Sequence, residues 1–241
     1  MRTVDTEGLD LKPGHAVLDM GCGQGRHIHA LHNHSDLRVY GLDRDSQSLQ
    51  QAHSGCSTYF PAGSNFPSRW LVMHGECRDL PFASRSLDAV ICSEVLEHLA
   101  DYRAALQEIH RVLRPGGKLA LSVPRYGPER VCWLLSRGYR TEPGGHVRIF
   151  RARKLRDEVA ALGFAQLGGH YAHGLHTPYW WLKCLRWSRR ESWPPVRLYH
   201  KLLLWDLLSA PRSTRWLEKL LNPFLGKSVV FYFTRNGIST S

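Results

Sequence analysis

Short apolar runs alternate with amphipathic stretches along most of this chain. The runs at 15–20, 37–43, 70–75, 87–93 and 118–124 are rich in β-branched and apolar residues, which predicts buried strands. The stretches at 25–33, 46–53 and 102–113 predict helices, and a Ser/Gly/Pro-rich loop is expected at 54–68. Because strands that alternate with helices form right-handed βαβ units, we expect an α/β, doubly wound, mostly parallel sheet with helices on both faces.

The last third of the chain departs from this alternation. A connector from 125 leads to a predicted helix at 152–163 and a strand at 164–171, but the seventh strand, at 227–234, follows some 55 residues later. Helical stretches at 179–185, 196–209 and 216–221 fill the interval. We therefore expect a core at 1–177, an inserted helical cap at 178–226, and the last strand with a C-terminal tail at 227–241.

The composition is that of a folded protein, since 43% of the 241 residues are apolar and 22% are charged. The six cysteines are scattered without a CxxC pair and are expected to be reduced thiols, as in the cytoplasm. No run approaches the roughly 18 apolar residues of a membrane span, and the first residues lack the apolar core of a secretory signal. We expect a cytoplasmic protein that at most lies peripherally on a membrane.

The end of the first predicted strand carries a glycine-rich turn. Gly21, Gly23 and Gly25 alternate with other residues, which lets the backbone bend sharply and approach a ligand closely. Asp19 comes before the first glycine, where a carboxylate suits a cationic group and disfavours a pyrophosphate. This turn therefore argues against nicotinamide and flavin dinucleotides and favours a positively charged cofactor.

Two further acidic residues end the next two strands. Asp43 closes the second strand, where a carboxylate accepts hydrogen bonds from both hydroxyls of a ribose. Glu76 follows the third strand and suits an exocyclic amine. Each carboxylate alone could form a turn or cap a helix. The three in order, at successive strand ends, point to a ligand with an amine, a ribose and an adenine.

Five segments resemble the motifs of the class I S-adenosylmethionine-dependent methyltransferases, and most closely the branch of the ubiquinone-biosynthesis enzymes. They are VLDMGCGQG (17–25), VYGLDRD (39–45), GECRDLPF (75–82), LDAVICSEVLEHL (87–99) and VLRPGGKLALSVP (112–124). The resemblance implies the Rossmann-like methyltransferase fold and S-adenosyl-L-methionine as cofactor. Glu76 stands where the family usually has aspartate. The carboxylate that accepts the hydrogen bond is retained, but the glutamate side chain is one methylene longer.

The resemblance also implies a set of cofactor-binding residues. Asp19 and the glycine backbone would hold the aminoacyl end, Asp43 the ribose with Arg44 beside the adenine, and Glu76 the adenine amine with help from the Cys77 amide. The residues after the fourth strand would line the methionine side. The full set is Asp19, Gly21, Cys22, Gly23, Gly25, Asp43, Arg44, Glu76, Cys77, Cys92, Ser93 and Glu94.

Methyl transfer from a sulfonium is an in-line substitution that often needs a base for the acceptor's proton. Four histidines near strand ends are candidates for an acceptor-side role, although each could equally be a structural histidine: His146, His176, His173 and His98, in that order. His146 lies in a loop similar to the GxHxxxxF segment of the ubiquinone O-methyltransferases, with one residue fewer before the phenylalanine. Glu94, Glu97 and His98 could hold a divalent metal, but we predict none.

The turn after the fourth strand, Ser93-Glu94-Val95-Leu96, is unlike the Asn-Pro-Pro-Tyr turn of amino-group DNA and glutamine methyltransferases. We therefore expect a small-molecule or lipid-like acceptor, methylated at oxygen rather than nitrogen or carbon. An RNA substrate and a non-catalytic cofactor-binding partner protein remain as alternatives. We do not expect nucleic acid as a partner, and the oligomeric state is undetermined.

Charge is divided unevenly along the chain. The net charge is +11, but residues 1–124 carry 12 basic and 14 acidic side chains, whereas residues 125–241 carry 20 and 7. Six of the eight tryptophans fall between 180 and 216, beside Lys and Arg. This pattern fits an ordinary cap packed on the sheet as well as an interfacial helix at a membrane. If the cap contacts the methyl acceptor, its positive charge predicts an anionic or membrane-borne substrate.

Overall fold

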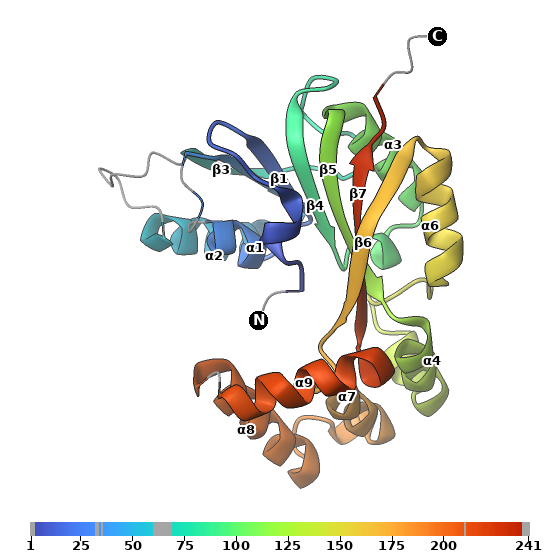
Figure 1. Ribbon diagram of the computed structural model, residues 1–241. Coiled ribbons are helices and arrows are strands. Elements are labelled where there is room, and N and C mark those ends of the chain that lie inside the picture. Colours follow the sequence, from blue (N-terminus) through green and yellow to red (C-terminus); the bar gives the residue numbers. More distant parts are fainter. Residues whose placement is uncertain (1–2, 32–33, 35, 60–68, 210, 238–241) are drawn as a thin grey trace.

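The computed structural model describes residues 3–31, 34, 36–59, 69–209 and 211–237. Seven strands form one sheet in the order β3-β2-β1-β4-β5-β7-β6 (Figure 1). β1 to β5 pair in parallel, and β7 runs antiparallel between β5 and β6. The strands are β1 (Ala16–Met20), β2 (Arg38–Asp43), β3 (Arg69–His74), β4 (Leu87–Ser93), β5 (Leu113–Pro124), β6 (Phe164–Ala172) and β7 (Ser228–Arg235). The predicted α/β, mostly parallel seven-stranded sheet is confirmed.

Helices cover both faces of the sheet. On one face α3 and α6 pack Ile109 and Val159 into the core, and on the other α1 and α2 contribute Ile28 and Leu49. The helical segments are η1 (Thr6–Leu9), α1 (Arg26–Ala30), α2 (Ser46–Tyr59), η3 (Leu96–His98), α3 (Tyr102–Val112), α4 (Tyr126–Leu135), α5 (Arg137–Arg140), α6 (Ala152–Ala161), α7 (His176–Leu185), η4 (Trp187–Arg189), α8 (Pro194–Ser209) and α9 (Arg212–Leu225).

Three sequence predictions were wrong in detail. Residues 54–59, expected in a loop, continue α2, because the buried side chain of Cys56 packs into the core from this turn. Residues 114–117, expected only to stop the preceding helix, do so and also belong to β5, which pairs with β4 through a register shift between Leu87 and Ala89. The connector after 125 contains α4 and α5. Residues 60–68 of the predicted loop lie outside the described residues.

The region predicted as a cap lies at the carboxyl end of the sheet. The chain leaves β6 at Ala172, forms α7, α8 and α9, and returns at Ser228, which pairs with both Pro124 and Ala172. In Figure 1 these three helices lie below the edge where β1, β4, β5 and β6 end. Within the described residues, no helix combines the length and apolarity needed to cross a membrane. The cap and this edge of the sheet enclose the site.

Candidate functional site

The turn after β1 can be built only from glycine at its first position. Gly21 has a φ of 73°, and a Cβ there would lie 2.4 Å from Cγ2 of Val95. Its amide donates to the carbonyl of Leu42 over 2.7 Å, which ties the turn to β2. The turn therefore passes closely beneath the loop that follows β4 and exposes its backbone to the space between them.

Asp19 lies at the end of β1 with an unsatisfied acceptor. Its side chain is only 1% exposed, and Oδ2 has no hydrogen-bond partner among the described residues. Its Oδ1 lies 3.7 Å from Nδ1 of His27. Buried polar atoms without partners are rare in folded proteins, so this oxygen points to a donor supplied by a ligand. A cationic group beside the glycine turn would fit it.

Asp43 and Glu76 bring two further carboxylates to the same edge. Asp43 accepts from the amide of Gly23 over 2.8 Å and from that of Asp45 over 2.9 Å, which fixes its carboxylate beside the glycine turn. A cleft of about 170 Å³ lies between these strand ends. Its walls are Gly21, Asp43, Arg44, Gly75, Glu76, Cys77, Glu94, Val95, His98 and Leu99.

Six residues of the predicted cofactor set do not line this cleft: Asp19, Cys22, Gly23, Gly25, Cys92 and Ser93. Cys22 and Cys92 are buried in the two halves of the core, and burial raises the pKa of the Cys92 thiol well above its usual range. The Cys92 side chain is fully buried, so it supports the cleft from below and is not part of its wall. Ser93 is also buried and shares a 2.9 Å hydrogen bond with Ser122.

Glu94 connects the cleft to a second pocket. Its backbone has a φ of 57°, a conformation that a residue with a side chain adopts only when its surroundings enforce it. Ser122 donates to its Oε1 over 3.0 Å. Burial raises the pKa of Glu94 above its usual value, although the charge of Lys227 opposes this. Glu94 and His98 line both spaces, so the two adjoin at these side chains.

The second pocket, which we call the acceptor pocket, has a volume of about 480 Å³. Its walls come from the loop before α6, from α5, and from the cap. They combine aromatic rings with paired charges: Lys183 lies 3.1 Å from Glu191, and Arg190 lies 3.2 Å from Glu142. The lining residues are Glu94, His98, Tyr139, Glu142, Pro143, Gly144, Gly145, His146, Trp180, Lys183, Trp187, Arg190, Glu191 and Lys227.

His146 is held in the acceptor pocket by a buried carboxylate. Its Nδ1 lies 2.7 Å from Oε1 of Glu129, which is 1% exposed. Tyr139 donates to the same oxygen over 2.9 Å, and Nζ of Lys227 lies 3.6 Å from the other. Burial alone would raise the pKa of Glu129. The hydrogen bond from His146 and the charge of Lys227 together have a larger effect, so the net result is a lowered pKa. Nε2 of His146 has no hydrogen-bond partner in the described part of the chain.

His98 lies beside His146, with 4.9 Å between the ring centroids. Its Nδ1 donates to the carbonyl of Gly144 over 2.9 Å, so this imidazole helps to hold the loop that carries His146. Burial and the neighbouring His146 lower the pKa of His98. Glu97 is fully buried next to this pair, and burial and the charge of Glu94 raise its pKa well above the usual range.

The other two predicted histidines lie apart from this pair. His173 and His176 have ring centroids 5.4 Å apart and lie at the junction of β6, α7 and α9, and neither lines the acceptor pocket. The structure thus divides the four candidates into two pairs. Sequence reasoning missed Glu129, Tyr139 and Lys227, because α4, α5 and the start of β7 must fold together before these residues meet His146.

Comparisons with known proteins agree with this geometry. Residues 18–121 match the family model described as "Methyltransferase domain". The chain is 34% identical over 117 residues to the O-methyltransferase cnsE of Penicillium expansum, an alignment that covers 48% of this chain and 41% of cnsE. It is 26% identical over 231 residues to the sterol 24-C-methyltransferase erg6 of Aspergillus fumigatus, covering 90% of this chain and 55% of erg6. The chain thus spans about half the length of these two curated relatives.

Solved structures show the same fold. Phosphoethanolamine N-methyltransferase 2 of Haemonchus contortus, solved in complex with S-adenosyl-L-methionine, superposes with a TM-score of 0.62 at 17% identity, covering 96% of this chain and 51% of that one. An orphaned carboxylate oxygen, a tight glycine turn and acidic residues at two further strand ends give this chain the groups that such a cofactor requires. Residues 18–121 are therefore similar to a methyltransferase domain, and the described chain has the fold of this solved methyltransferase.

Proposed function

We propose that this protein methylates a hydroxyl oxygen of a small-molecule or lipid-like acceptor held in the acceptor pocket. The observation that carries the proposal is the Glu129–His146 pair, which opens onto a pocket that shares Glu94 and His98 with the cofactor cleft. When bound, S-adenosylmethionine supplies an electrophilic methyl group. Asp19, Asp43 and Glu76 would hold its amine, ribose and adenine, and the amide of Cys77 would assist at the adenine.

The acceptor's proton would pass to Nε2 of His146. Glu129 accepts the hydrogen bond from Nδ1, which leaves Nε2 as the basic nitrogen, and its charge stabilises the imidazole once it is protonated. Tyr139 and Lys227 in turn fix the carboxylate. The rings of Trp180 and Trp187 suit a flat or apolar acceptor body and exclude water from the transfer. An oxygen acceptor fits this base, since a hydroxyl must lose its proton as the methyl group arrives.

The test is transfer of a radiolabelled methyl group into cell extracts that are afterwards separated into lipid, RNA and small-molecule fractions. We expect label in the small-molecule or lipid fraction, lost with His146→Gln and retained with His53→Gln, an exposed histidine on α2. Label in RNA would instead support the RNA methyltransferase alternative. Binding of S-adenosylhomocysteine without transfer to any fraction would support a non-catalytic cofactor-binding protein.

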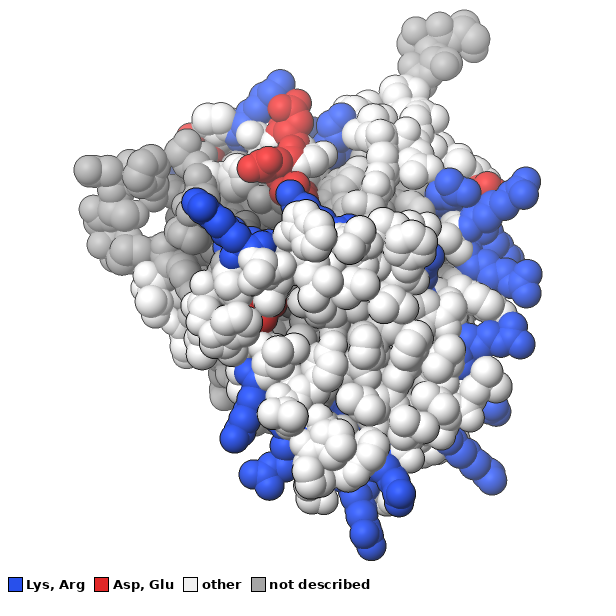
Figure 2. All heavy atoms as spheres, turned by 60° about the horizontal axis from the view of Figure 1, so that its bottom comes forward, with Lys and Arg blue, Asp and Glu red and all other residues white. Residues whose placement is uncertain are grey.

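We also propose that the cap contacts an anionic membrane and receives a lipid-borne acceptor from it. Exposed apolar side chains are frequent on two helices: Leu198, Leu202, Leu204, Trp205, Leu207 and Leu208 on α8, and Trp216, Leu217, Leu220 and Phe224 on α9. Figure 2 shows this end of the molecule as a broad white surface with Lys and Arg along its lower and right edges. Residues 178–223 carry nine basic and three acidic side chains. An apolar face with a basic border fits lipid headgroups.

Flotation with vesicles tests the membrane proposal. We expect the protein to float with phosphatidylglycerol vesicles at low salt and less at high salt, because part of the attraction is electrostatic. Phe224→Ser with Leu208→Ser should reduce flotation at both salt concentrations. Leu71→Ser on β3, at the opposite end of the sheet, is the control, because its side chain is 53% exposed but lies far from the cap. Absence of flotation at either salt concentration would exclude the proposal.

A further inference from the structure

A group of three potential metal ligands lies where the cap joins the sheet, outside the cofactor cleft and the acceptor pocket. His173 follows the last residue of β6, His176 begins α7, and Glu218 lies in α9. One nitrogen of each imidazole and one carboxylate oxygen all lie within 4.8 Å of one another. The three residues are separated by up to 45 positions in the chain, so only the packing of α9 against the end of β6 brings them together.

Two atoms of this group are buried without partners. Nδ1 of His176 and Oε1 of Glu218 have no hydrogen-bond partner among the described residues, although neither is reached by solvent. Nδ1 of His173 lies 4.0 Å from Oε1 of Glu218, too far for a hydrogen bond. Two imidazole nitrogens and a carboxylate oxygen that lie close together, with two buried atoms of the group lacking a hydrogen-bond partner, form an arrangement that a cation can satisfy.

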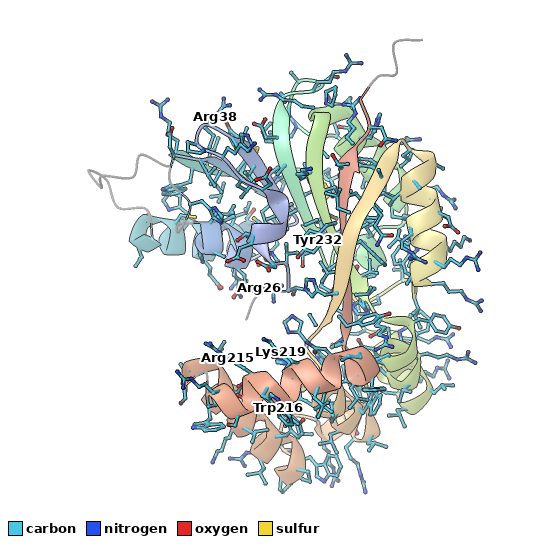
Figure 3. The ribbon with its side chains drawn as sticks, viewed as in Figure 1. Arg26, Arg38, Arg215, Trp216, Lys219 and Tyr232 are labelled. Carbon is cyan, nitrogen blue, oxygen red and sulfur yellow. The ribbon has the colours of Figure 1, made fainter. Side chains whose placement is uncertain are left out.

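The surroundings leave the group largely enclosed. The side chains of His173 and Glu218 are 12% and 19% exposed, so an ion between them would be mostly shielded from solvent. Figure 3 shows Arg26 at the edge of the core that faces α9, the helix that carries Glu218.

A second contact orients one of the three ligands. Oγ1 of Thr3 lies 3.0 Å from Nε2 of His173, which leaves Nδ1 directed at Glu218. His173 has a φ of 65°, an uncommon backbone conformation for a residue with a side chain, which the surrounding contacts must enforce. Metal-binding histidines usually have such a partner on the second nitrogen.

We propose that His173, His176 and Glu218 bind a divalent transition-metal ion, of which zinc is the best match. Two imidazoles and one carboxylate are ligands that Zn²⁺ accepts, and tetrahedral bonds of about 2.0–2.1 Å bring its ligands to roughly 3.3 Å from one another, a contraction of about 1 Å from the present spacing. The fourth position would face a cavity of about 420 Å³ that His173 and Glu218 help to line. The ion would join α9 to the end of β6 and so fix the cap on the sheet.

Metal titration of the full chain tests this site. Tag-free protein is stripped with a chelator and titrated with Co²⁺, then Zn²⁺. We expect one equivalent of Co²⁺ to produce visible d–d absorption without a thiolate charge-transfer band, Zn²⁺ to displace it, and the melting temperature to rise by about 5 °C at a hundredfold excess over the dissociation constant. His176→Ala and Glu218→Gln should each weaken binding about 100-fold, and Thr3→Val about 10-fold.

A second group of potential ligands provides the control. Glu97, His98 and His146 also lie within 4.8 Å of one another. The variant His98→Gln/His146→Gln should keep the Co²⁺ spectrum and its affinity. The proposal is overturned if stripped protein binds no Co²⁺ or Zn²⁺, if His176→Ala and Glu218→Gln both bind as the unaltered protein does, or if only the control variant loses the metal. If His176→Ala does not fold, Glu218→Gln, whose side chain keeps its shape, decides the question.

Discussion

Removing the Asp43 carboxylate should greatly weaken binding of the demethylated cofactor, S-adenosylhomocysteine. We propose that this carboxylate accepts both ribose hydroxyls, while it already holds the amide of Gly23 over 2.8 Å. Hydrogen bonds to a charged acceptor contribute about 1.5–3 kcal/mol each. Loss of two such bonds, partly replaced by water, amounts to about 3–4 kcal/mol. Asp43→Ala should therefore raise the dissociation constant by about 10²–10³-fold.

Isothermal calorimetry measures this change without knowledge of the acceptor. Asp45→Asn is the matched control, because this exposed carboxylate lies two residues away and accepts from the backbone and hydroxyl of Ser48 instead of facing the cleft. Its dissociation constant should stay within about twofold of the unaltered protein, and circular dichroism should show both variants folded. A folded Asp43→Ala that binds S-adenosylhomocysteine within threefold of the unaltered protein would refute the assignment of Asp43 to the ribose.

Three further predictions concern the base, the glycine turn and a buried acid. Glu129→Gln should lower kcat about 10³-fold, because an ion pair at an effective dielectric constant of 20 is worth about 4 kcal/mol at 4 Å and each 1.4 kcal/mol is about tenfold in rate. Glu158→Gln, which loses a similar bond to Tyr102, should leave kcat unchanged, and equal rates in both variants would exclude the base. Gly21→Ala should lower the free energy of unfolding, measured by urea titration, by at least about 2 kcal/mol. Gly14→Ala should lower it by only about 1 kcal/mol, because φ is also positive there but no atom lies within 4 Å of the added Cβ. Glu97→Gln should stabilise the protein at pH 8 more than at pH 5, because the raised pKa of Glu97 makes the stability of the unaltered protein fall by about 1.4 kcal/mol per pH unit between the unfolded and the folded pKa. An equal effect at both pH values would contradict this.

The sequence alone was sufficient for the sheet and for placing the predicted cofactor-binding carboxylates at its strand ends. Apolar runs alternating with amphipathic stretches specify βαβ units, and parallel strands place their carboxyl ends at one edge. Asp19, Asp43 and Glu76 each directly follow or end a strand, so their proximity follows from topology and needs no knowledge of side-chain packing. The glycine turn is also determined by local sequence, because the positive φ at Gly21 is a backbone conformation that favours glycine.

Glycine and proline gave incomplete predictions of element boundaries where tertiary contacts outweighed their local preferences. The connector after 125 contains α4, whose first turn holds Pro128, because a proline is tolerated where its missing amide has no partner. The glycines at 116 and 117 indicated the end of a helix, yet β5 includes them as an irregularity between Leu113, which pairs with Leu87, and Lys118, which pairs with Ala89. Both signals describe local preference, which packing and strand pairing routinely override.

The sequence by itself determined the fold and which strand ends carry the three acidic residues, because both depend on patterns within a few neighbouring residues. Only the tertiary structure decided which buried group lies beside each candidate histidine. His146 lies beside Glu129 from α4, which Lys227 at the start of β7 approaches in turn, whereas His173 and His176 lie beside Glu218 from α9. The same holds for the apolar sides of α8 and α9, since a hydrophobic stripe looks alike in sequence whether another element covers it or solvent does.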